Sequence, residues 1–62
     1  MHRVTLLFKT EKDMREFYEV IRARNAEINT RTFTMLCDCH EREVELAINA
    51  FGATVIRREQ LS

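Results

Sequence analysis

The fold of this chain is decided by residues 33–41, FTMLCDCHE. Apolar and polar side chains alternate over residues 32–37, and this two-residue period predicts a strand. The side chains on its core-facing side are expected to be Phe33, Met35 and Cys37. Asp38 follows, with Glu41 three residues later, which is the spacing of a helix N-cap and capping box. The stretch is therefore predicted to be a strand that runs into the start of a helix.

Downstream of this stretch, apolar residues recur on one face of the predicted helix. They are Val44, Ala47, Ile48 and Phe51. Gly52, the only glycine in the chain, stands where a helix C′ residue belongs, because glycine adopts the left-handed conformation without strain. Residues 53–57 are predicted to form a last strand with Val55 directed inward. We expect residues 1–58 to form a single domain and residues 59–62 to be a frayed tail.

Upstream, residues 3–9 alternate in the same way and predict a first strand. Its inward side chains are expected to be Val4, Leu6 and Phe8. Thr10 is predicted to cap a helix, with Asp13 three residues on in a variant of the capping box. The buried face of that helix is expected to consist of Met14, Phe17, Tyr18 and Ile21. Asn25 is expected to close the helix in the left-handed conformation.

The two halves of the chain repeat one pattern. Residues 4–7, VTLL, match residues 33–36, FTML, and residues 25–28, NAEI, match residues 52–55, GATV. Two strand–helix–strand halves joined by a turn give the order βαββαβ, which is the ferredoxin-like arrangement of the α+β class. Right-handed crossovers then place both helices on one face of a four-stranded antiparallel sheet. The alternative merges the middle strands into a three-stranded βαβαβ sheet, and a separate strand at residues 26–30 distinguishes the two.

The other face of that sheet would be left open. Its side chains are expected to be Thr5, Leu7, Thr34, Leu36 and Ile56. A solvated face with scattered aliphatic side chains accounts for them, and so does an interface with a second copy or another protein. A domain this small buries only about 60% of the surface of its unfolded chain, so further burial in a homodimer would stabilise it. We therefore favour an interface.

The composition argues against several classes of partner. Ten basic residues balance ten acidic ones, so no overall field attracts nucleic acid or an anionic membrane. The open-face positions carry threonine and leucine in place of the aromatic side chains that stack on RNA bases. No apolar run approaches the roughly 20 residues of a membrane span, and the N-terminus lacks the features of a signal peptide. We expect a cytoplasmic protein that binds neither nucleic acid nor membranes.

The strand-to-helix junction is the candidate chemical site. Cys37, Cys39 and His40 place two soft thiols and an imidazole within four residues, a set that can bind Cu(I) or Zn(II). Cys37 is also expected to belong to the core. Cys39, at a helix N-terminus, is expected to be accessible and to have a lowered pKa.

No motif for catalysis accompanies this junction. The sequence has no glycine-rich phosphate loop, no paired carboxylates and no hydrolase motif. The primary hypothesis is therefore a non-enzymatic protein-interaction module without a cofactor, which forms a homodimer through its open sheet face or an edge strand. The alternative hypothesis is a Cu(I)- or Zn-binding domain that uses Cys37, Cys39 and His40.

Overall fold

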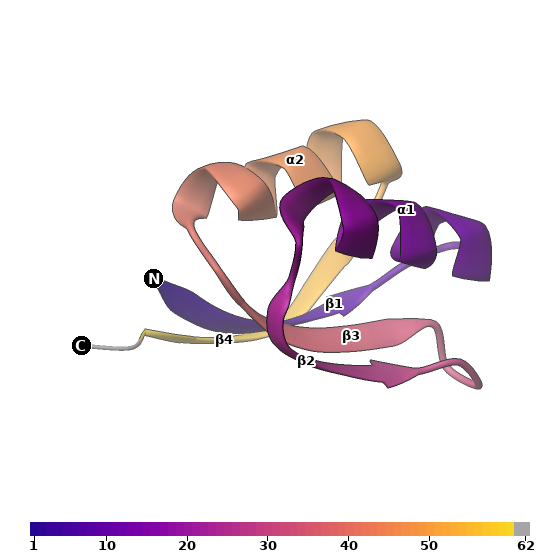
Figure 1. Cartoon of the computed structure of the whole chain (residues 1–62), viewed down its shortest axis with the longest axis horizontal. Coiled ribbons are helices and arrows are strands. Elements are labelled where there is room, and N and C mark those ends of the chain that lie inside the picture. Colours follow the sequence, from indigo (N-terminus) through magenta and orange to yellow (C-terminus); the bar gives the residue numbers. More distant parts are fainter. Residues whose placement is uncertain (61–62) are drawn as a thin grey trace.

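The computed structural model describes residues 1–60, and Gln60 by its backbone alone. Its elements follow one another in the predicted βαββαβ order (Figure 1). They are β1 (His2–Leu7), α1 (Glu11–Ile21), β2 (Arg24–Asn29), β3 (Thr34–Cys39), α2 (Glu41–Phe51) and β4 (Thr54–Gln60). The separate strand expected near residues 26–30 is present as β2, so the three-stranded alternative is wrong.

The four strands form one antiparallel sheet in the order β2-β3-β1-β4. Helix α1 connects β1 to β2 across β3, and α2 connects β3 to β4 across β1. Both helices therefore lie on the same face of the sheet, and the opposite face is left uncovered (Figure 1). This arrangement confirms the ferredoxin-like fold that the repeated sequence pattern predicts.

The core lies between the sheet and the two helices. Alternate residues of β1 and β3 and one stripe of each helix point into it, because strands repeat every two residues and helices every 3.6. Its fully buried side chains include Val4, Leu6, Met14, Phe17, Met35, Cys37, Cys39, Val44 and Ala47. The ring of Phe17 lies at the centre, with its centroid 5.5 Å from the rings of both Phe8 and Phe51.

Two of the four helix ends, the start of α1 and the end of α2, match their predicted caps. The hydroxyl oxygen of Thr10 accepts a hydrogen bond of 3.1 Å from the backbone N–H of Asp13, as expected of an N-cap. Gly52 closes α2 with a φ of 66°, also as expected. Helix α1, however, ends at Arg22, which takes the left-handed conformation with a φ of 51°. Asn25 has the same φ but lies within β2, where the pairing with β3 shifts register.

The start of α2 differs from the prediction. Asp38 is not its N-cap, because β3 continues through Cys39 and pairs with β1 along its whole length. The N-cap is His40, whose backbone N–H donates a hydrogen bond of 2.8 Å to the carboxylate of Glu43. The predicted capping-box spacing is therefore correct, but it begins two residues later than at Asp38 and Glu41.

Two aromatic residues predicted to be buried are exposed. Phe33 precedes β3 in the left-handed conformation, with a φ of 58°, and its side chain is turned out of the strand alternation and is 36% exposed. Tyr18 lies at the edge of the buried stripe of α1 and is 39% exposed. Strand β3 thus begins at Thr34, two residues after the predicted start, because the backbone at Phe33 is not extended.

The first and last strands have different bounds from those expected. Strand β1 ends at Leu7, although Phe8 beyond it is buried as predicted. Strand β4 begins at Thr54 and includes Glu59 and Gln60, which were expected to lie in a frayed tail. The remainder of that predicted tail, residues 61–62, lies outside the described residues. Val55 is half-buried against the core and pairs with Leu6.

Candidate functional site

The structure brings Cys37 and Cys39 together on the core side of β3. Residues two apart in a strand share a face, so the extension of β3 through residue 39 directs both side chains inward. Each is fully buried, and their Sγ atoms are 3.0 Å apart. Both cysteines are free thiols. The prediction for Cys37 is confirmed, whereas the expected accessibility of Cys39 is wrong.

The environment of Cys39 does not favour a thiolate. The hydrogen bond that it shares with Cys37 raises the pKa of Cys39, and burial raises it further. The same hydrogen bond lowers the pKa of Cys37, with burial acting in the opposite direction. Within the pair, Cys37 is therefore expected to lose its proton more readily than Cys39. The reactive thiolate predicted at the start of α2 is wrong, because Cys39 points into the core rather than toward the helix N-terminus.

His40, the third predicted metal ligand, is exposed at the surface while both thiols are buried. Within the described part of the chain, no three His, Cys, Asp or Glu residues form a group that could bind a metal ion. The arrangement thus offers two adjacent sulfur atoms inside the core, and the Cu(I) or Zn(II) site stays a prediction.

A polar cluster occupies the open face where the sequence indicated only a helix cap. Nη1 of Arg3 lies 2.9 Å from Oδ1 of Asp38, and Nδ2 of Asn25 donates a hydrogen bond of 2.7 Å to Oδ2 of the same carboxylate. Nη2 of Arg3 also lies 3.6 Å from the carboxylate of Glu27. The hydrogen bonds from Asn25 and Arg3 lower the pKa of Asp38. This cluster links β1, β3 and β2 through side chains.

The predicted interface residues share the helix-free face of the sheet. Strands β1 and β3 pair Thr5 with Leu36 and Leu7 with Thr34, so these four side chains form adjacent cross-strand pairs. Leu7 is 37% exposed and Ile56 is 56% exposed. Ile56 lies where the pairing of β4 with β1 shifts register. A shallow hollow of about 100 Å³ on this face is lined by Arg3, Thr5, Leu36, Arg57 and Glu59.

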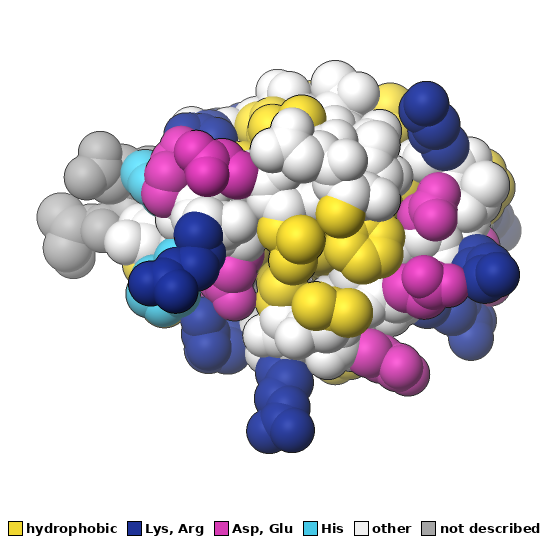
Figure 2. Space-filling view, turned by 90° about the horizontal axis from the view of Figure 1, so that it is seen from above, with side chains coloured by type: hydrophobic (Ala, Val, Ile, Leu, Met, Phe, Trp, Pro, Cys, Tyr) yellow, Lys and Arg dark blue, Asp and Glu magenta, His cyan; other side chains and the backbone are white. Residues whose placement is uncertain are grey.

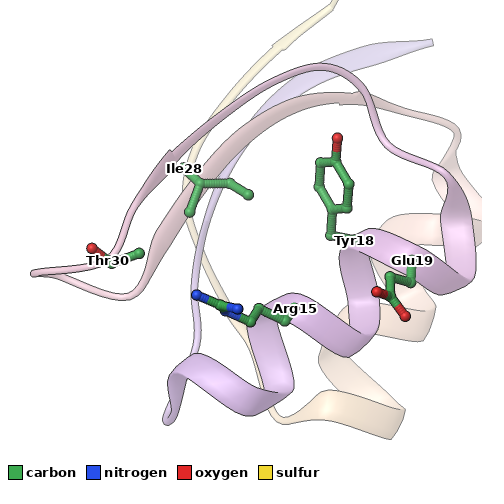
Figure 3. Close-up of a pocket in the computed structure, with 5 residues that line it drawn as sticks. All are labelled: Arg15, Tyr18, Glu19, Ile28 and Thr30. Carbon is green, nitrogen blue, oxygen red and sulfur yellow. The ribbon is translucent and has the colours of Figure 1, made fainter.

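A second surface lies on the helix side of the sheet and was not indicated by the sequence. It is a groove of about 440 Å³ between α1 and the edge strand β2 (Figure 3). Its lining residues are Arg15, Tyr18, Glu19, Ile28 and Thr30. The groove is open because little of β2 is covered: Ala26 is half-buried, and every other residue of this strand is exposed. The helical spacing of Tyr18 pointed to the core, and only the position of α1 relative to β2 makes it a surface residue.

The helix-bearing face also exposes apolar side chains. Figure 2 shows hydrophobic side chains gathered in the middle of this face, with basic and acidic side chains around them. The exposed apolar residues of the two helices include Tyr18, Val20 and Ile48. None of the helices within residues 1–60 is long and apolar enough to cross a membrane.

Comparisons with protein-family models, with curated proteins and with solved structures give no significant match for this chain.

Proposed function

We propose that this protein is a non-enzymatic interaction module that binds a protein partner, and that this partner is a second copy of the chain. Contact is made through the open sheet face or through an edge strand. The observation that supports the proposal is a sheet covered on one side only, with β2 and β4 at its edges. Uncovered faces and unpaired strand edges are the surfaces through which small domains associate.

The size of the domain supports self-association. A core of this size supplies only about 3–5 kcal/mol of stability, so burial of more apolar surface in a dimer has a large relative effect. The two thiols, which are the candidate reactive groups, lie inside the core. A buried cysteine in this setting acts as a small apolar side chain, which is consistent with a protein that binds rather than catalyses.

Sedimentation equilibrium over a micromolar concentration range tests the proposal. We expect a monomer–dimer equilibrium. Leu36→Lys places a charge on the open face, and Val20→Lys is the matched control because Val20 is 62% exposed on α1. A dimer weakened by Leu36→Lys but not by Val20→Lys indicates the open face. A dimer that both variants retain indicates that the two copies associate through an edge strand. A protein that stays monomeric at all concentrations overturns the proposal.

A second candidate function rests on the 3.0 Å separation of the Cys37 and Cys39 sulfur atoms. Two adjacent thiolates are suitable ligands for Cu(I), and together with His40 they were predicted to bind Cu(I) or Zn(II). Titration of the reduced protein with each metal tests this function. Binding that is unchanged in the double variant Cys37→Ser, Cys39→Ser would exclude these thiols as the ligands.

A further inference from the structure

The two edges of the sheet differ in how well they are protected from pairing with another chain. On β4, Arg57, Arg58 and Glu59 follow one another, and the register shift at Ile56 interrupts the strand. Charges and bulges of this kind discourage edge-to-edge association. Strand β2 pairs only with β3, and its irregularity lies at its start, between Arg24 and Glu27. The segment from Glu27 to Asn29 is therefore the more open edge.

Apolar side chains lie beside this open edge. Ile28, on the helix side of β2, is 42% exposed, because it pairs with the buried Met35 but extends beyond the cover of α1. Ile28 and Tyr18 both line the groove and point into the space between β2 and α1 (Figure 3). Backbone groups available for pairing and partly exposed apolar side chains thus occur together at one margin of the sheet.

We infer that β2 of a second copy pairs antiparallel with β2 along this edge, about a two-fold axis at Ile28, and joins the two sheets into one of eight strands. The inference rests on the proposed function and names its surface. Directly opposed residues in an antiparallel pair point to the same face. The axis must therefore pass through a residue that faces itself, which within the open segment is Glu27, Ile28 or Asn29.

The strand bounds and the side chains decide among these registers. Pairing about Asn29 sets Ile28 opposite Thr30, which lies beyond the end of β2. Pairing about Glu27 sets two like charges directly opposite each other, which is destabilising. Pairing about Ile28 sets two β-branched apolar side chains opposite each other and places Glu27 opposite Asn29 of the second copy. The two grooves then meet, and Tyr18 of each copy covers one side of the Ile28 pair.

The charges on α1 fit the same symmetry. Arg15 and Glu19 both line the groove one helical turn apart. The two-fold axis orients α1 antiparallel to α1 of the second copy. Arg15 of each subunit is therefore placed toward Glu19 of the other. Glu19 makes no ion pair or side-chain hydrogen bond within residues 1–60, whereas Arg15 lies 3.1 Å from Glu11. The surface is therefore complementary to itself, as an isologous interface requires.

Disulfide trapping tests the register. Ile28→Cys places one new thiol on the axis, where the Cβ atoms of directly opposed residues lie about 4.5–5.5 Å apart. We expect mild oxidation of this variant to give a covalent dimer. The unchanged protein should not cross-link, since its own thiols are buried. Leu36→Cys and Val20→Cys are the controls for the open face and for a helix surface.

Each outcome of the trapping experiment has one meaning. Efficient cross-linking of Ile28→Cys alone supports the inference. If Leu36→Cys cross-links and Ile28→Cys does not, the protein still self-associates but through its open face, and the inference is overturned while the proposed function stands. If sedimentation detects no dimer, both fail together.

Charge reversal gives an independent measurement. Arg15→Glu and Glu19→Arg should each weaken the dimer, by about three- to tenfold in Kd, because the symmetry repeats each unfavourable contact twice. The double variant Arg15→Glu, Glu19→Arg should restore it. The same exchange at the Lys12–Glu16 pair of α1, which does not line the groove, is the matched control and should leave the Kd unchanged. A double variant as weak as either single one overturns the inference.

Discussion

The burial of both cysteines predicts how slowly a thiol reagent will label the folded protein. Cys37 and Cys39 have no exposed surface, so a reagent such as an aromatic disulfide reaches them only when the domain opens. If the core supplies about 3–5 kcal/mol, the open state is populated at about one part in 10² to 10⁴. We therefore expect labelling of the native protein to be about 10²- to 10⁴-fold slower than labelling in denaturant. The assay follows, at fixed pH, the absorbance of the aromatic thiolate that the reagent releases as each cysteine reacts.

A variant that destabilises the domain away from the cysteines provides the control. Thr10→Ala removes the hydrogen bond to the backbone of Asp13 and should cost about 1 kcal/mol. Both thiols should then react about fivefold faster, because opening becomes that much more frequent. A thiol that reacts in the native protein within a few-fold of the denatured rate would contradict the burial of the pair. Fast labelling that Cys39→Ser abolishes would place Cys39 at the surface, as the sequence alone had predicted.

Three further predictions concern the core, one helix end and the open face. Phe17→Ala should cost about 3–5 kcal/mol and leave the protein largely unfolded by circular dichroism at 25 °C, because Phe17 is fully buried against two other rings; a cooperative melt near that of the unchanged protein would contradict this. Gly52→Ala should cost about 1–2 kcal/mol in urea unfolding, since a φ of 66° strains any residue with a Cβ, and the nearest atom, Cε of Lys9, is at an ordinary 3.5 Å. Gly52→Asn should lower the free energy of unfolding by less than Gly52→Ala does, because asparagine tolerates the left-handed conformation better. The pKa of Asp38 is lowered in the folded protein. Its ionised carboxylate therefore stabilises the fold above about pH 3.9, the ordinary pKa of an aspartate in an unfolded chain. This stabilisation is lost as the pH falls through the lower pKa that Asp38 has in the folded protein. Unfolding of Asp38→Asn should therefore depend less on pH below about pH 4, and equal pH dependence in both proteins would count against the cluster.

Much of the architecture follows from periodicity, which depends on neighbouring residues alone. The alternation around Val4 and Leu6 and the helical stripe that includes Met14 and Phe17 identify buried positions that the structure confirms. The cap at Thr10 was likewise predictable, because a cap is a contact between residues three apart. Local patterns are reliable where the contact that they describe is itself local.

The candidate site was less predictable because its geometry depends on where β3 ends. A strand that stops at Cys37 leaves Cys39 outside the core, whereas pairing with β1 up to His2 extends β3 by two residues and turns Cys39 inward. The same pairing sets Arg3 opposite Asp38 and converts an expected helix cap into part of a polar cluster. No local signal distinguishes these cases, since the partner residues lie about 35 positions away in the chain.

The sequence by itself determined the order of elements, most of the buried face of each helix and the α+β class, because these follow from short-range periodicity and turn residues; Tyr18 and Ile48, which the helical spacing also placed on the buried faces, are exposed. Tertiary structure alone decided which surfaces remain available: it buried Cys39, placed charges on the open face and left Ile28 and Tyr18 beside an unprotected edge. The physical reason is that exposure depends on which segments pack over a residue. That packing is set by strand order and by the position of α1 over the sheet, neither of which any single stretch of sequence specifies.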